Sequence, residues 1–479
     1  MKNPNRTSLK LLLSTGVCLS ALFVASFARA AVTYWDPQGT AAGNPYTGNM
    51  SGTWENSSWS ASSAGTASPV PWVEGNAAVF GVHTGNGTPA YTITMNANHN
   101  IAGAFDGSLT PNACDVTING TGQWLLANGQ GFNEHNSSDG AIAYLRINVP
   151  IVDGSYASAT TGQIVAQNNG QIFLNGANTY SGGNFGIGIG GTLLGYSGSS
   201  WSGIINFNSS QSFGTGSIAL MRGFSGSFGA LVAEGSSAIT LPNVLDFSQS
   251  LSNAPYLNIV GNAAGVTFSG ATHLGSRSVN LGSGASGNLV TLGGAVDGTG
   301  SLTKFGNSTL QLSSVNTYSG TTTVSAGTLK LGIANAIGST TGLIMNGGTL
   351  DPGGFNHSML SAQLTLSDNS IIDFGSGNSL LKFANSSSAV WAGGKILNLA
   401  NWTGTGGQTG PDEMEFGIDA SGLTPAQLAE IEINGDPTTL GYASLDAQGF
   451  LIIPEPSTGL LALVGGLGLA WAARRRKVQ

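Results

Sequence analysis

Residues 298–332 read GTGSLTKFGNSTLQLSSVNTYSGTTTVSAGTLKLG, and they alternate short apolar runs with Gly, Asn and Ser-Gly turns. In the runs Thr309–Leu312 and Thr328–Leu331, every second residue is leucine. Alternation with a period of two places one set of side chains on one face of a strand, and the punctuation is typical of turns. The stretch therefore predicts short strands whose leucines point into a shared core.

The same alternation recurs along the chain, for example in Tyr91–Met95, Val116–Ile118 and Ser278–Leu281. It predicts an all-β body of about 30 or more short strands. One stretch, Leu423–Ile431, is instead expected to form a short surface helix between strands. Thr424 can cap it, and the following proline and glutamine complete the signal of a helix N-terminus.

The body also repeats itself. Residues 174–182, LNGANTYSG, return as residues 312–320, LSSVNTYSG. Self-similarity built from strand and turn units is typical of a solenoid, in which successive coils stack. In such a stack, Asn178 and Asn316 are expected at corners or in hydrogen bonds along the axis, and Tyr180 and Tyr318 at a corner.

Residues 298–332 closely resemble the autotransporter-associated β-strand repeat of bacterial surface passengers, and residues 171–195 resemble it weakly. The resemblance implies a right-handed parallel β-helix, a solenoid. Autotransporters of this kind finish in an outer-membrane barrel of alternating strands. This sequence finishes in an apolar run instead, so we expect the repeat to serve here as architecture.

Residues 1–30 are typical of a secretory signal peptide, with cations before the apolar run 11–27. Ala28, Ala30 and Ala31 supply the small residues expected around signal-peptidase cleavage. Removal of this segment leaves Cys114 as the single cysteine, so no intramolecular disulfide is expected.

Residues 454–479 begin with Pro454, Glu455 and Pro456 and continue with an apolar run, 457–473. Such a run predicts a single short transmembrane helix. Cations that follow it stay on the cytoplasmic side because their transfer through a bilayer is costly. The expected stop signal consists of Arg474, Arg475, Arg476 and Lys477.

This order of parts resembles the PEP-CTERM sorting signal of Gram-negative bacteria. The resemblance implies an exosortase-type transpeptidase as a partner beside signal peptidase. It also implies transient anchoring in the inner membrane and then release to the cell surface or extracellular matrix, with exopolysaccharide as the expected neighbour. The alternative is a C-terminal anchor that is never processed.

Charge limits the possible partners. Residues 31–453 hold seven Lys or Arg and 22 Asp or Glu, a formal charge of −15. Nucleic acid is not an expected partner, because phosphate binding needs a basic patch.

No catalytic, cofactor or metal residues are predicted. Residues 186–191 and 282–287 match a dinucleotide-binding pattern, but neither opens a helix after a strand, as that mechanism requires. The five histidines share no ligand spacing and are expected at the surface. Residues 412–415 form the densest acidic cluster and are expected in a solvated loop. Acids are sparse in residues 162–350, which argues against a polysaccharide lyase or hydrolase.

Five of the nine tryptophans lie in residues 31–160. They are expected to fill the first coils or a cap of the solenoid. The alternative is a glycan contact, for which Trp54 and Trp59 are the candidate residues.

The sequence thus divides into a signal peptide (1–30), an N-terminal β region or solenoid cap (31–160), a β-helix (161–350), a C-terminal β region with one short helix (351–453) and a sorting signal (454–479). We expect an exported, non-enzymatic structural or adhesive protein. The alternative is an extracytoplasmic β-helix that binds or cleaves polysaccharide.

Overall fold

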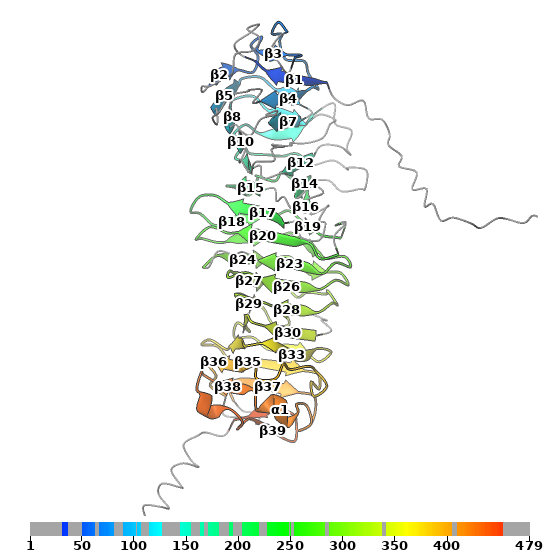
Figure 1. The fold of residues 1–479 in the computed structure, drawn as a ribbon, viewed down its shortest axis with the longest axis vertical. Coiled ribbons are helices and arrows are strands. Elements are labelled where there is room, and N and C mark those ends of the chain that lie inside the picture. The colour runs from blue at the N-terminus through cyan, green and yellow to red at the C-terminus, as the bar shows by residue number, and fades with distance from the viewer. Residues whose placement is uncertain are drawn as a thin grey trace, which may run out of the picture.

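The computed structural model describes residues 31–453 except 37–49, 63–66, 81–89, 102, 107–114, 127–143, 155–162, 167–170, 182–190, 195–203, 220–227, 249, 251–252, 283–286, 338–341 and 405–409. The predicted signal peptide (1–30) and the predicted sorting signal (454–479) lie entirely outside the described residues. The described chain forms an elongated stack of short strands, with the N-terminal strands at one end and the C-terminal strands at the other (Figure 1).

One sheet runs through most of this stack and is called the long sheet below. Its 13 strands follow chain order: β2 (Met50–Thr53), β5 (Ala90–Met95), β8 (Asp115–Gly120), β10 (Tyr144–Ile147), β13 (Gln171–Leu174), β15 (Ile204–Phe207), β17 (Phe228–Ala233), β20 (Tyr256–Val260), β23 (Val279–Gly282), β26 (Leu302–Phe305), β28 (Thr322–Val324), β30 (Gly342–Asn346) and β33 (Gln363–Asp368). The long sheet has strands on both sides of the predicted domain boundaries at 160/161 and 350/351, so one sheet joins those regions.

A second sheet, the nine-stranded sheet, covers the C-terminal half of the stack. It contains β18 (Ile239–Leu241), β21 (Val266–Phe268), β24 (Leu289–Leu292), β27 (Thr309–Leu312), β29 (Thr328–Leu331), β31 (Thr349–Asp351), β34 (Ser370–Asp373), β36 (Leu397–Ala400) and β38 (Ile431–Ile433). A three-stranded sheet occupies the N-terminal coils, with the order β11 (Ile151–Asp153), β9 (Trp124–Leu126) and β6 (His99–Ile101).

Smaller sheets complete the coils. A six-stranded sheet holds β12 (Gln163–Ala166), β14 (Gly191–Leu194), β16 (Ser217–Ala219), β19 (Leu245–Asp246), β22 (Thr272–His273) and β25 (Val296–Asp297), and another of three strands holds β32 (His357–Met359), β35 (Ser379–Phe383) and β37 (Asp412–Phe416). The first strands form the order β3 (Trp59–Ser60), β1 (Val32–Trp35), β4 (Ala77–Phe80) and β7 (Gly103–Asp106). The last two strands are β39 (Ser444–Leu445) and β40 (Leu451–Ile452).

Strand direction identifies the architecture. Among the paired strands of the described residues, β1–β3 and β39–β40 are antiparallel, and all other pairs are parallel. Parallel neighbours that follow one another in chain order arise when the chain winds in successive coils. The described chain is therefore all-β and consistent with a β-helix solenoid, as the sequence predicted.

The register shows how the length of a coil varies along the stack. Leu302 aligns with Thr322, and Thr322 aligns with Leu343, so these two coils of the repeat have almost the same length. Farther toward the N-terminus, Ile172 aligns with Ile205, and the coil between them is clearly longer. The strands keep their register while the connections vary in length, because only the strands have to align their inward rows.

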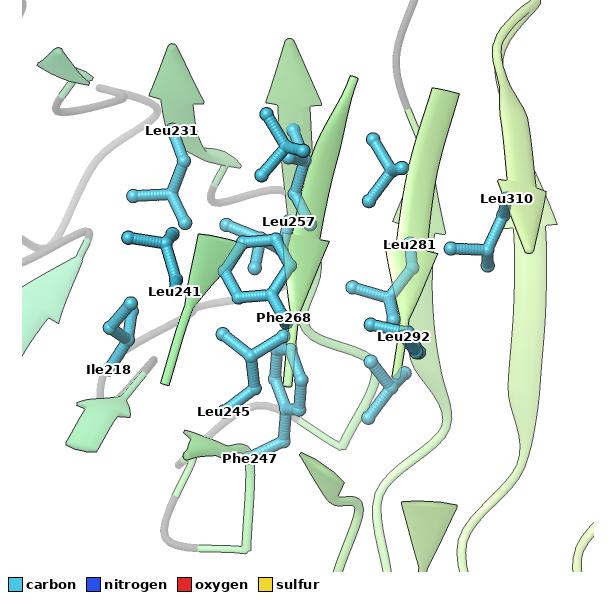
Figure 2. Close-up of a cluster of buried hydrophobic side chains, with 14 of the residues drawn as sticks. Ile218, Leu231, Leu241, Leu245, Phe247, Leu257, Phe268, Leu281, Leu292 and Leu310 are labelled. Atoms are coloured by element: carbon cyan, nitrogen blue, oxygen red, sulfur yellow. The ribbon is translucent and has the colours of Figure 1, made fainter. Parts of the chain in front are cut away.

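Inward rows of aliphatic side chains build the core. Leu257 and Leu281 of the long sheet are 1% and 0% exposed, and Leu310 of β27 is 1% exposed. Figure 2 shows such side chains from several coils gathered between the strands, together with Phe247 and Phe268. Complete burial of one such side chain stabilises the fold by about 1.5–3 kcal/mol, and the contribution recurs coil by coil.

The C-terminal end of the long sheet is closed by side-chain and backbone contacts from residues 386–392. Ser386 Oγ accepts from the N–H of Leu364 at 3.0 Å, and the indole N–H of Trp391 donates to the Leu364 carbonyl at 2.9 Å. The N–H of Ala392 donates to the carbonyl of Leu366 at 2.7 Å. These contacts occupy backbone groups of β33 that would otherwise offer an open edge to another chain.

The predicted helix is shorter than expected and is not a surface helix throughout. Helix α1 comprises Pro425–Leu428, with Thr424 at its N-cap and the predicted capping box in place. Ile431, expected in this helix, belongs to strand β38. Gln427 is 4% exposed because its Nε2 donates to the carbonyls of Ser386 and Ala389 at 2.9 and 3.0 Å. One 3₁₀ helix, η1, follows at Pro437–Thr439.

Candidate functional site

The N-terminal tryptophans form an aromatic core inside the first coils. Trp54 and Trp59 are both 0% exposed, with ring centroids 4.7 Å apart. The indole N–H of Trp59 donates to the carbonyl of Trp54 at 3.0 Å. Trp35 and Trp72 pack against Trp59 with centroids 5.1 and 4.7 Å away. Burial of so many rings agrees with the expectation that these tryptophans fill the first coils.

This burial removes the basis for the alternative interpretation of Trp54 and Trp59 as a glycan contact. An aromatic ring binds a sugar through an exposed face, and neither indole offers one in this structure. The sequence shows the residues as a close pair, but it does not show that neighbouring strands enclose them.

A histidine between two glutamates lies beside this aromatic core. Nδ1 of His99 is 2.7 Å from Oε1 of Glu74, and Nε2 is 3.3 Å from Oε1 of Glu55. Burial opposes ionisation of Glu55, but hydrogen bonds from the N–H groups of Ala97 and Asn96 and from His99 outweigh it and lower the pKa of this carboxyl. His99, Glu55 and Glu74 thus hydrogen-bond to one another and to the backbone of residues 96, 97 and 100, which ties the first coils together.

Two of the five histidines contradict the prediction that all lie at the surface. His99 is 8% and His357 1% exposed. Burial lowers the pKa of His357, although its Nε2 lies 3.0 Å from the carbonyl of Pro352. His273 is partly exposed and contacts Asp297 at 2.9 Å. His83 and His135 lie outside the described residues.

The repeated asparagines bridge three coils, as one of the two predicted roles requires. Oδ1 of Asn316 accepts from the N–H of Val296 at 2.7 Å in the preceding coil, and Nδ2 donates to the carbonyl of Ala336 at 2.5 Å in the next coil. Asn178 repeats this arrangement with Ile151 N–H at 2.8 Å and the Ser212 carbonyl at 2.7 Å. We call each such asparagine a coil clamp.

The repeated tyrosines are buried beside these clamps. Tyr180 and Tyr318 are both 0% exposed. The Tyr318 hydroxyl lies 2.7 Å from Oγ1 of Thr322, and burial raises the pKa of this phenol. Both residues therefore act as packing residues in equivalent places of the two sequence copies.

One inward position of the repeat holds a lysine. Lys304 is 0% exposed, and its Nζ donates to the carbonyls of Phe305, Gly306 and Ala326 at 2.8, 2.6 and 3.0 Å. Burial lowers the pKa of Lys304 to about 8. Lys304 is thus a charged side chain on the inward face of a strand in the repeat, and its ammonium group caps a turn between coils.

The acidic cluster at 412–415 is not a solvated loop. These residues lie on strand β37, and Asp412 and Glu415 are 2% and 8% exposed. Oδ2 of Asp412 accepts from the N–H and hydroxyl of Thr403 at 2.9 and 2.6 Å. Glu415 forms an ion pair with Lys382. Asp412 and Glu415 are therefore buried with partners in the fold, and the half-buried Glu413 accepts from the N–H of Gly410 at 3.1 Å.

A second group of charged residues lies along the outside of the nine-stranded sheet. Lys330 contacts Asp351 at 3.1 Å across neighbouring strands, and Asp373 ends the next strand. Oδ1 of Asp351 accepts from Gly353 N–H at 2.7 Å, and Oδ1 of Asp373 accepts from Gly375 N–H at 3.0 Å. Both carboxylates are therefore occupied in holding turns.

A shallow groove with a volume of about 470 Å³ lies where β34, β36 and β38 end, and we call it the amide groove. Three of its lining side chains are asparagine amides. The groove is lined by Gly375, Asn398, Ala400, Asn401, Trp402, Thr403 and Asn434. Sequence reasoning missed it, because these residues meet only after the chain completes a coil, as the pairing of Asn398 with Glu432 shows.

Hydrogen bonds hold the groove residues in fixed orientations. Oδ1 of Asn398 accepts from Gly435 N–H at 3.0 Å, and Nδ2 of Asn401 donates to Oδ1 of Asp373 at 2.6 Å. Asn434 accepts from the N–H of Trp402 at 2.9 Å and donates to the carbonyl of the same residue at 3.1 Å.

Among the described residues, no group of three or more His, Cys, Asp or Glu side chains could hold a metal ion. In the same part of the chain, no helix has the length and apolar character needed to span a membrane.

Comparison with known proteins agrees with the repeat architecture. The family model described as passenger-associated-transport-repeat matches residues 302–331. This match confirms the predicted autotransporter-associated repeat, and the matched residues include the coil clamp Asn316 and the buried Lys304.

One relative extends this similarity. The chain is 32% identical over 219 residues to a protein of Brucella suis biovar 1 (strain 1330) named "Adhesin BmaC autotransporter". The aligned part covers 42% of this chain and 6% of the relative, so the chain spans a small fraction of that protein's length. No solved structure matches the chain.

Proposed function

We propose that this protein is exported and works at the cell surface or in the extracellular matrix as a non-enzymatic, structural and adhesive right-handed β-helix. The observation that carries the proposal is the continuous parallel ladder from β2 to β33, which contains a passenger-type repeat. A rigid stack of this kind presents long faces to a partner. The relative named as an adhesin supports the same role.

The route to the surface is part of the proposal. Signal peptidase would cut after Ala30, and an exosortase-type enzyme would act at Pro454–Pro456. The apolar run 457–473 and the cations at 474–477 would hold the chain in the inner membrane until then.

The test is the intact mass and location of the mature protein in cells with and without the sorting enzyme. We expect a C-terminus near residues 454–457 and a position outside the inner membrane only when the enzyme is present. A chain ending at Gln479 in the inner membrane of both strains would contradict the proposed sorting.

A second candidate is a polysaccharide-binding protein in the same location, and the amide groove favours it over a polysaccharide-cleaving one. Cleavage needs a carboxyl group free to exchange a proton with the substrate. Asp351, Asp373 and Asp412 already accept hydrogen bonds within the fold. Release of reducing or unsaturated sugars by the purified chain would favour the enzyme.

A further inference from the structure

The amide groove offers one free donor and one free acceptor at fixed places. Because Oδ1 of Asn398 accepts from Gly435 N–H, the Nδ2 group of Asn398 is left as the donor, and it has no partner among the described residues. In Asn401 the roles of the two amide atoms are exchanged. Its Nδ2 donates to Asp373, and its Oδ1 has no partner in the described part of the chain.

The groove is built in advance of any ligand. Asn401 and Asn434 have φ angles of 54° and 52°, so the backbone is held in the left-handed region on two adjacent coils. Trp402 is 6% exposed and packs edge-to-face on Phe374, with centroids 5.0 Å apart. A ligand that binds here does not have to order these groups, which reduces the entropy lost on binding.

The surrounding backbone excludes an added peptide strand. The carbonyl of Ala400 accepts from Phe374 N–H at 3.0 Å, and that of Leu399 accepts from Asn434 N–H at 3.0 Å. The N–H groups of Trp402 and Gly435 donate to asparagine side chains. These four backbone groups at the groove are therefore already paired, whereas strand addition requires a free row of such groups.

Charge narrows the ligand class further. No cation is among the described residues that line the groove, and the carboxylates of Asp373 and Asp412 hydrogen-bond to its residues Asn401 and Thr403. Phosphate groups and acidic sugars would meet repulsion at this place. The ligand class that remains is a neutral molecule whose hydroxyl groups both donate and accept hydrogen bonds.

We propose that the amide groove binds a neutral oligosaccharide, one ring of which donates a hydroxyl to Oδ1 of Asn401 and accepts from Nδ2 of Asn398. This inference rests on the proposed adhesive function and supplies the ligand class for it.

The test uses the full-length chain on an array of neutral and acidic oligosaccharides, followed by titration of the best neutral ligand. The variants are Asn398→Ala, which removes the donor, and Asn401→Gly, which removes the acceptor and tolerates the positive φ. The matched control is Asn346→Ala at the exposed end of β30. Thermal unfolding of each variant shows whether the fold is kept.

We expect the double variant to bind at least about tenfold more weakly, as the loss of two hydrogen bonds implies, and the control to bind as the wild type does. Three results would overturn the inference: no neutral oligosaccharide bound, equal binding by a folded double variant, or binding of peptides that these substitutions abolish.

Failure here is distinct from failure of the proposed function. Surface location with no saccharide binding would remove the groove's ligand and leave the surface role intact. Saccharide binding by a chain that stays in the inner membrane would support the groove's ligand and contradict the surface role.

Discussion

The coil clamp at Asn316 gives the most direct prediction about stability. Asn316→Ala removes both hydrogen bonds and leaves Val296 N–H and the Ala336 carbonyl without that partner inside the stack. A buried polar group without a partner costs about 1–3 kcal/mol, so the two groups together cost about 2–6 kcal/mol. Since coils stabilise their neighbours, the loss should appear as local opening of the coils between residues 296 and 336.

Urea unfolding gives the change in the free energy of unfolding, and hydrogen exchange with mass spectrometry locates it. Asn178→Ala, at the equivalent clamp, should show a loss of the same size around residues 151–212. Asn346→Ala is the control, because its Nδ2 is exposed and 3.4 Å from Oγ of Ser325; it should change stability by less than about 0.5 kcal/mol. A loss at Asn316 as small as that of the control would refute the clamp.

Three further predictions test other parts of the structure. Trp59→Ala should destabilise the N-terminal coils by about 3–5 kcal/mol in urea unfolding, and a folded variant of unchanged stability would contradict the buried aromatic core. Gly300→Ala places a Cβ 2.0 Å from the carbonyl oxygen of Arg277 and should lower the midpoint of thermal unfolding. The control Gly393→Ala has open space around its Cβ and should leave the midpoint unchanged. Equal effects of the two substitutions would be evidence against the close approach of the coils at Gly300. The pKa of Lys304 in the folded state is about 8, below the usual value of 10.5. Between these two pH values the unfolded state therefore binds more protons than the folded state. The stability of the wild type relative to Lys304→Met should accordingly rise with pH from about 8 to 10.5. A difference that stays constant over that range would show that Lys304 is not buried as a cation.

Local patterns were sufficient to predict the strands. The runs 91–95, 309–312 and 328–331 lie in β5, β27 and β29, because alternation with a period of two follows directly from strand geometry. The recurrence of the same residues at 174–182 and 312–320 marked Asn316 as a structural position, and hydrogen bonds along the axis were one of the two roles predicted for it.

Features that depend on coil length could not be predicted. Lys304 shares the inward face of Leu302, but the three carbonyls that accept from its ammonium group, one of them in the next coil, cannot be inferred from the sequence of its own strand. Trp54 and Trp59 are close in sequence, but their burial depends on the strands that enclose them. The amide groove likewise needs the register that brings Asn398 beside β38.

The measurement that tests the central claim most directly is attachment of the producing cells to one another and to their matrix, with and without the chain. The proposed adhesive role predicts that deletion reduces attachment, that the full-length chain restores it, and that the purified chain releases no sugar fragments from the matrix. Unchanged attachment after deletion, or depolymerisation of the matrix by the purified chain, would contradict it.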